Sequence, residues 1–547
     1  MEDVFVYPLK NSNEYKEIIN SICERKGALQ LNGLLDMQKP HITYSIFKEL
    51  ARPTLFIANS DLEAKKVYNE LRFYTKDKVE YLGTDEIYFY HLDAKDRSEE
   101  AKKLRVLLKL AKKQKTIVVT SVDAILRKYI PKKVLLDNIF TYKIGDIINL
   151  EELSQNLVRL GYERVSRIEG LGQFSIRGGI IDVYSLEYTN PIRIELFDDE
   201  IDSIRTFDVF SQKSIDKIKK VVITPSREFI YPEDTTSAVE KIKEETNKYT
   251  DDDVLKNIEN ISDRTYFQGV ENYIDYLYDD QNKSIFSYLP DNGIVVMSDI
   301  SRLKERCENY LNEFKDNYNL NLERGLAIKN QGNLIYSYEE LPYILEDKKL
   351  IINSLLAKPI NGFSVNNVID FNSREIPAYN SKLDTLVEDL NRFKYNGYKI
   401  ILAVNSSDRC KKLQKDLLDL GLEVGISKSR NTEIKSSQII IVPANISKGF
   451  EYKSIKFQVI TDTEIIGVNK RVSKKTKNKK NKDGKKIESF LDLKIGDYVV
   501  HENSGIGRYT GIEQISVNGI KKDYLKIIYQ GGDNLYVPID QMDKVQK

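Results

Sequence analysis

Hydrophobic and polar positions along the chain follow two rhythms that replace one another from segment to segment. In the first 147 residues, short apolar runs such as Thr54–Ala58 (TLFIA) and Thr116–Thr120 (TIVVT) alternate with stretches of helical spacing such as Glu99–Ala111. Such runs are typical of strands buried on both faces, and strands that alternate with helices indicate a parallel sheet. The start of the chain is therefore predicted to be an α/β domain. Its other expected elements are a strand at Ala28–Leu31 and helices at Ile42–Leu50 and Asp61–Leu71.

Between residues 148 and 232 the pattern changes to that of a β-rich domain. The segments Gly172–Tyr184, Ile192–Val209 and Val221–Phe229 are rich in β-branched and aromatic residues. After residue 232 the helical spacing returns, and the strand Gly293–Met297 precedes a long helix at Ile300–Asp316. We therefore expect the β-rich segment to be an insertion in the first α/β domain.

A second α/β domain is predicted for residues 364–465. Buried strands are expected at Ile400–Val404 (IILAV) and Gln438–Val442 (QIIIV), and amphipathic helices at Ser381–Phe393 and Ser407–Leu420. No residues with an evident chemical role occur in this segment, so we interpret it as a spacer that positions its neighbours.

The end of the chain predicts several short strands separated by turns. The turn signals are Ser504-Gly505, Asn518-Gly519 and Gly531-Gly532, and Asn-Gly supplies the positive φ angles that a tight hairpin needs. Five or so strands within sixty residues indicate a small, strongly bent β-barrel. The strands are expected at Tyr498–His501, Ile512–Val517, Tyr524–Tyr529 and Leu535–Pro538.

Composition and charge restrict the function. A chain of 547 residues is long enough for about three to five domains. The net charge is +1, but Lys470–Lys486 contains ten Lys or Arg and one Asp, a net of +9, which leaves −8 for the rest. This basic segment cannot bury a core, so we expect a flexible linker that makes at most weak contacts with DNA phosphates. The folded part does not have the charge of a nucleic-acid-binding domain.

The sequence offers no sign of a membrane segment, a signal peptide or a metal site. There is no apolar window of eighteen residues, and the N-terminus lacks a basic start followed by an apolar core. The three cysteines, Cys23, Cys307 and Cys410, are scattered, which indicates ordinary thiols in a reducing compartment. We therefore predict a cytoplasmic location, no membrane contact and no metal or catalytic residues.

The turn after the first strand partly matches a phosphate-binding loop. Such a loop has the pattern GxxxxGK[ST], and Gly33 and Lys39 have the required spacing. Gln38 replaces the second glycine, and Pro40 replaces the hydroxyl residue and lacks an N–H group. We interpret the turn as a P-loop-like strand–helix connection without a nucleotide site, and we expect no bound cofactor. A nucleotide-hydrolysing P-loop enzyme remains the alternative.

The C-terminal pattern GDYVVH…GIGRY.GI…YL.I.Y…LYVP resembles a known module. It is similar to the RNA polymerase-interacting module of bacterial transcription-repair coupling factors (Mfd) and of CarD-type regulators. The resemblance implies RNA polymerase, through its β subunit, as a partner. We expect Arg508, Tyr509 and Ile515 at or beside the contact, with the strand that begins at Ile512 added to an edge of the partner. An apolar Ile515 on an exposed edge would otherwise have no partner.

The β-rich segment carries the pattern GYxR…GQFSxRGGIIDV, which resembles the UvrA-docking region of UvrB and Mfd. The resemblance implies that Arg164, Phe174 and Arg177 face UvrA. Forked guanidinium groups suit such an interface because they pair with carboxylates. Only seven residues separate Tyr90 from Ser98, so the long aromatic hairpin with which UvrB holds damaged DNA has no room here.

The resemblances give the following expected organisation. The fold class is multidomain α/β, with a degenerate P-loop-like parallel-sheet domain, a β-rich insertion, a second small α/β domain and a C-terminal SH3/Tudor-like β-barrel. The expected boundaries are 1–147 and 233–363 for the two parts of the UvrB-like domain, 148–232 for the UvrA-binding domain, 364–465 for the spacer, 466–489 for the linker and 490–547 for the barrel.

The expected function is the coupling of stalled RNA polymerase to nucleotide excision repair. The family continues with an ATP-driven DNA translocase, and no intact Walker or DExx motif occurs here. We therefore expect an N-terminal fragment that is not itself an enzyme, with ATP and Mg²⁺ used only by the missing motor. A free-standing CarD-like transcription regulator is a further alternative, although it would not need the UvrB-like half.

Overall fold

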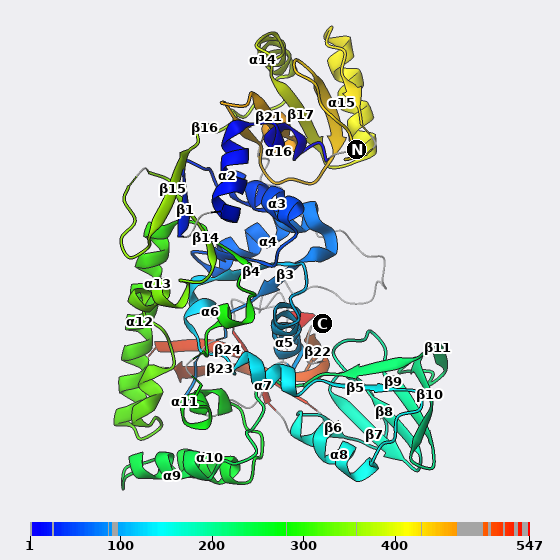
Figure 1. Cartoon of the computed structure of the whole chain (residues 1–547), viewed down its shortest axis with the longest axis vertical. Coiled ribbons are helices and arrows are strands. Elements are labelled where there is room, and N and C mark those ends of the chain that lie inside the picture. Colours follow the sequence, from blue (N-terminus) through cyan, green and yellow to red (C-terminus); the bar gives the residue numbers. More distant parts are fainter. Residues whose placement is uncertain are drawn as a thin grey trace. The chain divides into compact units, whose positions relative to one another are not determined.

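The computed structural model describes residues 3–24, 27–85, 87–89, 97–280, 282–356, 358–427, 429–467, 496–501, 505–517, 520–529, 534–538 and 545–546. The chain divides into two compact units, Met1–Val468 and Asn469–Lys547 (Figure 1). The basic segment Lys470–Lys486 lies outside the described residues. So do residues 90–96, the position in the chain at which UvrB has its long hairpin. No helix in the described part of the chain is long and apolar enough to cross a membrane.

The first unit contains a seven-stranded sheet in which every described pairing is parallel, as the sequence predicts. Its strands come from both sides of the β-rich insertion, which confirms that the insertion interrupts one domain. The last strand in the chain, β15, pairs with β1, so this sheet extends to Asp370, beyond the expected boundary at 363. In sheet order the strands are β15 (Val365–Asp370), β1 (Ala28–Asn32), β14 (Lys349–Ser354), β13 (Ile294–Met297), β2 (Thr54–Ala58), β4 (Ile117–Ser121) and β3 (Val79–Leu82).

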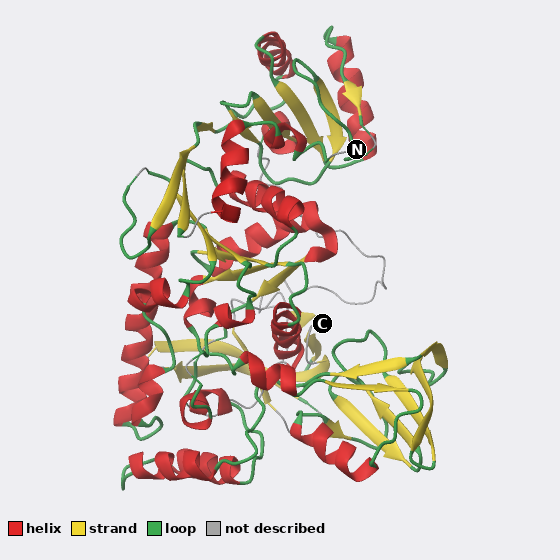
Figure 2. Ribbon diagram, in the orientation of Figure 1, coloured by secondary structure: helices red, strands yellow, loops and turns green. Residues whose placement is uncertain are grey.

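Helices cover both faces of this sheet (Figure 2). Along β2, Leu55 and Ile57 join one hydrophobic core, and Phe56 and Ala58 join a second core. This alternation places successive side chains on opposite faces, so a continuous apolar run is required. The described helices of this domain, not all of which touch the sheet, are α1 (Tyr7–Lys10), α2 (Asn13–Glu24), α3 (Gln38–Leu50), α4 (Asp61–Thr75), α5 (Arg97–Ala111), α6 (Val122–Leu126), α7 (Lys132–Asp137), α9 (Thr236–Glu245), α10 (Asp252–Ser262), α11 (Ile274–Leu277), α12 (Ile300–Glu323) and α13 (Leu341–Ile344).

The β-rich insertion forms a six-stranded sheet with the order β11-β10-β9-β8-β7-β6 and a two-stranded sheet of β12 and β5. Helix α8 (Leu150–Arg159) contributes Leu153 and Leu157 to the core of this domain. The strands are β5 (Phe140–Lys143), β6 (Glu163–Arg164), β7 (Gln173–Arg177), β8 (Ile180–Val183), β9 (Ile192–Phe197), β10 (Glu200–Phe207), β11 (Ser214–Ile218) and β12 (Lys220–Ile223).

The second α/β domain has a six-stranded sheet with the order β16-β20-β21-β17-β19-β18. Strands β17, β19 and β21 pair in parallel, and β20 and β16 add antiparallel at one edge. The strands are β16 (Ser373–Arg374), β17 (Lys399–Val404), β18 (Gly425–Ile426), β19 (Ile439–Pro443), β20 (Phe450–Tyr452) and β21 (Phe457–Thr461), and the helices are α14 (Leu383–Tyr395), α15 (Ser407–Asp419) and α16 (Asp462–Ile466).

The second unit is an antiparallel sheet with the order β25-β24-β23-β22-β26. Its described core is small: Val499, Tyr509, Leu525, Ile527 and Val537. The strands are β22 (Tyr498–His501), β23 (Gly505–Val517), β24 (Ile520–Ile528), β25 (Asn534–Pro538) and β26 (Val545–Gln546). The β architecture is confirmed, and the SH3/Tudor-like class stays a prediction.

Candidate functional site

The P-loop-like turn lies between β1 and α3, and its glycine has a structural reason to be there. Gly33 has a φ of +75°, and a Cβ atom at this position would collide with the carbonyl oxygen of Phe371. Glycine is the residue that tolerates both constraints. The close approach of the chain after β15 therefore accounts for Gly33 without any bound phosphate.

Gln38 closes the turn where a phosphate-binding loop would have its second glycine. Its side chain is fully buried. Its Oε1 accepts a hydrogen bond from the backbone N–H of Leu35 at 2.9 Å, and its Nε2 donates to the carbonyl oxygen of Glu451 at 2.9 Å. Glu451 lies in β20, so the second α/β domain sits directly against the start of α3.

Lys39 also has partners within the protein. Its Nζ lies 3.0 Å from Asp36 Oδ1 and 3.5 Å from Ser298 Oγ. Partial desolvation of the Asp36 carboxyl opposes its ionisation, but Lys39, Arg302 and Lys448 together lower the pKa of that carboxyl. A carboxylate thus occupies the neighbourhood that a phosphate would need. Protein groups therefore close the turn.

In the β-rich domain, Arg177 belongs to a network on the polar face of the sheet. Arg177 Nη2 donates to Asp182 Oδ2 at 2.8 Å. Arg193 donates to both oxygens of the same carboxylate, from Nε at 2.7 Å and from Nη2 at 2.8 Å. The Asp182 side chain is only 2% exposed, whereas that of Arg177 is 51% exposed. Arg177 therefore reaches the surface while one edge of its guanidinium is fixed from below.

The structure does not place the three predicted UvrA-facing residues together. Arg164 is exposed on the edge strand β6, and the parallel register pairs it with Phe174 of β7. Phe174 is fully buried in the domain core. The expectation that its side chain faces a partner is therefore wrong, because at this position of the strand the side chain points into the domain core. Since side chains alternate along a strand, Arg177 lies on the face opposite to Arg164 and Phe174.

The predicted polymerase-contacting residues of β23 also separate into two groups. Arg508 and Ile512 are exposed, and Arg508 Nε donates to the carbonyl oxygen of Gly496 at 3.2 Å. Tyr509 is buried in the core of the second unit, so its side chain lies beside the predicted contact surface and not on it. Ile515 is paired with Lys522 of β24, and the structure describes only its backbone.

Sequence reasoning missed an exposed apolar surface beside these residues. Tyr498 pairs with Arg508 and Val500 pairs with Ile506 across β22 and β23. Tyr498, Val500 and Ile506 are exposed, while Val499 between them is buried. The alternation in Tyr498–Val500 is the sequence signal that could have identified this outward face.

Two family models match parts of this chain. The model of the UvrB interaction domain matches residues 140–229, and the model of the CarD-like/TRCF RID domain matches residues 493–547. The chain carries both domains.

Relatives similar to the whole chain are named transcription-repair-coupling factor. The protein from Bacillus subtilis is 32% identical over 554 residues, which cover 98% of this chain and 46% of the relative. Those from Staphylococcus epidermidis and Staphylococcus aureus are 27% identical over 561 and 559 residues and cover 100% and 98% of this chain. The chain spans about half the length of these curated relatives.

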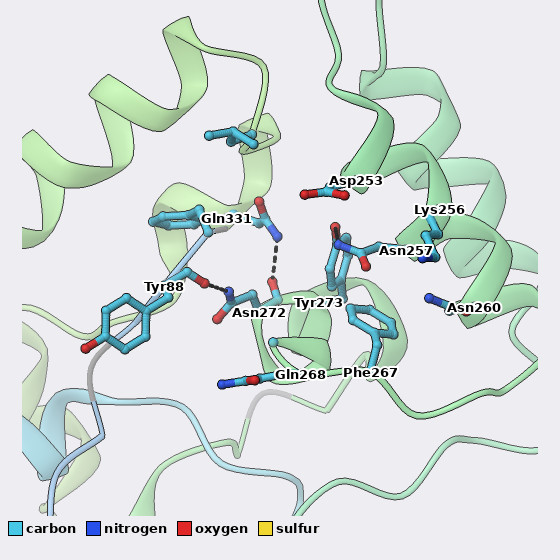
Figure 3. A pocket seen from close by; sticks show the side chains of 13 residues that line it. Tyr88, Asp253, Lys256, Asn257, Asn260, Phe267, Gln268, Asn272, Tyr273 and Gln331 are labelled. Carbon is cyan, nitrogen blue, oxygen red and sulfur yellow. Dashed lines mark hydrogen bonds between the residues drawn. The ribbon is translucent and has the colours of Figure 1, made fainter. Parts of the chain in front are cut away.

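A polar pocket of about 80 Å³ lies between α10 and the turn that leads into α11 (Figure 3). Asn272 Nδ2 donates to the carbonyl oxygen of Tyr88 at 2.7 Å, and Gln331 Nε2 donates to that of Asn272 at 3.4 Å. These bonds tie the pocket wall together, and its lining residues include no nucleophile beside a general base. In the described part of the chain, no group of three His, Cys, Asp or Glu side chains could hold a metal ion.

Proposed function

We propose that this chain couples transcription to nucleotide excision repair by binding UvrA and RNA polymerase. UvrA docks on the UvrB interaction domain, and the β subunit of RNA polymerase binds the CarD-like/TRCF RID domain. The observation that carries this proposal is the presence of both domains in one chain that is similar, over nearly all its length, to transcription-repair-coupling factors.

The exposed residues of each domain suit these roles. Arg177 offers a half-exposed guanidinium fixed by Asp182, and an arginine held in one orientation loses little freedom when it pairs with a partner's carboxylate. In the other domain, Ile512 is an exposed apolar residue, and Arg508 is exposed on the same strand. Apolar anchors beside arginine are typical of protein interfaces.

In this proposal, the catalytic activity is that of the complete protein and not of the described residues of this chain. The complete protein is an ATP-dependent DNA translocase that displaces stalled polymerase, and the described residues of this chain supply docking surfaces without a cofactor. The turn at Gly33–Pro40 binds no nucleotide, because Gln38 and Lys39 already have protein partners. Lys470–Lys486 makes at most weak contacts with DNA phosphates.

The test is a bridging experiment with purified components. UvrA is immobilised, the chain is added, and RNA polymerase core enzyme follows; polymerase should be retained only when the chain is present. Arg177→Glu should abolish capture by UvrA but leave polymerase binding intact, and Ile512→Arg should do the reverse. A wild-type chain that retains neither partner would overturn the proposal.

A further inference from the structure

The turn between β10 and β11 presents an aromatic side chain on a fixed backbone. Phe210 is 89% exposed. Asp208 holds the turn: its Oδ1 accepts from the N–H of Ser211 at 2.7 Å, its carbonyl oxygen accepts from the N–H of Gln212 at 2.8 Å, and its own N–H donates to Lys213 O at 3.0 Å. Gln212 Nε2 also donates to the carbonyl oxygen of Val209 at 2.8 Å. The ring is therefore carried by a turn whose backbone has little conformational freedom to lose on binding.

Arginines connect this turn to the polar face of the sheet. Arg167, itself exposed, donates from Nη2 to the carbonyl oxygen of Phe210 at 3.1 Å. Arg193 Nη2 donates to Gln212 Oε1 at 3.3 Å and to Asp182 Oδ2 at 2.8 Å. Arg177 donates to that same Asp182 oxygen. A continuous set of hydrogen bonds thus leads from Val209, the neighbour of Phe210 in the turn, through Gln212, Arg193 and Asp182 to Arg177.

We propose that Phe210 is the aromatic anchor of the UvrA-docking surface, with Arg167 and Arg177 as the guanidinium groups beside it. The inference rests on the proposed function, because it takes UvrA as the partner of this domain. The matching surface on UvrA is an apolar recess bordered by carboxylates, since a phenyl ring needs the first and two arginines need the second. The connection of the Phe210 turn to Arg177 makes this one surface rather than two.

A single exposed hydrophobic residue is common on protein surfaces and needs no explanation by itself. Phe210 differs because its backbone is immobilised before any partner arrives. A side chain held in its binding position contributes more net affinity, since less entropy is lost on association. Phe197 provides the comparison: it is 82% exposed, but it is the last residue of β9 and lies near the opposite end of β10.

The experiment titrates UvrA against the full chain and its variants. Phe210→Ser should weaken binding roughly thirtyfold, the typical loss for a dominant interface residue. Phe210→Tyr should bind within about threefold of wild type, because it keeps the ring. Arg167→Ala, which removes the bond to the Phe210 carbonyl, should weaken binding by roughly three- to tenfold. Phe197→Ser is the matched control and should bind like wild type.

Thermal melting of every variant accompanies the titration, and an exposed Phe210 predicts melting midpoints equal to that of wild type for both serine variants. Wild-type affinity in Phe210→Ser, or equal losses in Phe210→Ser and Phe197→Ser, would overturn the inference while the proposed function stands. No UvrA binding by the wild-type chain would overturn the proposed function and the inference with it.

Discussion

The closed turn at Gly33–Pro40 leads to a prediction about nucleotide binding. The perturbation is the double variant Gln38→Gly, Pro40→Thr, which restores the residues that a phosphate-binding loop requires at these positions. We expect neither the wild-type chain nor this variant to bind Mg-ATP. In the wild type, Gln38 fills the site; in the variant, the carbonyl oxygen of Glu451 and the carboxylate of Asp36 remain nearby and oppose a phosphate.

The magnitude follows from the bonds that would have to break. Opening the wild-type turn leaves Leu35 N–H and Glu451 C=O without the partner that Gln38 provides. Each unpaired buried group costs about 1–3 kcal/mol, so opening costs about 2–6 kcal/mol. The Lys39–Asp36 pair adds at most about 1 kcal/mol, because the Asp36 side chain is 81% exposed. At about 1.4 kcal/mol per factor of ten, a total cost of about 2–7 kcal/mol lowers any intrinsic affinity by roughly 30- to 10⁵-fold.

The assay is isothermal titration calorimetry with Mg-ATP at millimolar concentration, together with thermal melting. The wild-type chain should give no heat of binding, and the double variant should give none and should melt at a lower temperature, because both orphaned groups stay buried. Micromolar affinity of the wild-type chain would refute the closed-turn reasoning. Micromolar affinity of the variant alone would show that the side chains of Gln38 and Pro40 close the site. It would also show that the remaining Glu451 carbonyl and Asp36 carboxylate do not prevent phosphate binding.

Three further predictions concern the docking surfaces and pH. Arg177→Glu should abolish UvrA binding and also lower the melting temperature, because it places a second carboxylate beside buried Asp182, whereas Arg164→Glu changes an exposed residue on the opposite face and should leave both unchanged. Ile515→Arg should reduce polymerase pull-down at unchanged folding, and full-strength pull-down would contradict the assignment. Burial lowers the pKa of His41 from 6.5 to about 4, so the unfolded chain binds more protons between these values and stability falls as pH falls through this window, by about 3 kcal/mol in all. Urea unfolding at pH 7.5 and pH 5 should show a smaller loss in His41→Gln than in wild type.

Local patterns predicted the elements well where a segment is buried on both faces. The structure has the strand at Thr54–Ala58 with the predicted bounds, because its continuous apolar run supplies two cores. The strand Val365–Asp370 was not predicted, since its alternating Val and Asn residues give no buried run. That omission explains why the expected boundary at 363 cuts off the edge of the first sheet.

The error at Phe174 and the separation of Arg508 from Tyr509 have one physical cause. Arg508 and Tyr509 are neighbours on β23, as are Phe174 and the residues around it on β7. Adjacent side chains in a strand point to opposite faces, so Arg508 and Tyr509 cannot both face one partner. Of the two residues, Arg508 is exposed and Tyr509 packs in the core of the second unit. Alternation, applied to the motif, would have separated them.

Gln38 shows what sequence reasoning could not supply. The sequence predicts that glutamine is unsuited to a phosphate site, but it does not reveal the partner Glu451, which lies 413 positions away in the chain. Around the same contact, His41 Nε2 donates to the carbonyl oxygen of Phe5 at 2.8 Å, and Nδ1 accepts from the hydroxyl of Tyr452 at 3.1 Å. A glycine at position 38 could not reach Glu451. Gln38 therefore joins the two α/β domains, and this contact gives the turn at Gly33–Pro40 a structural role.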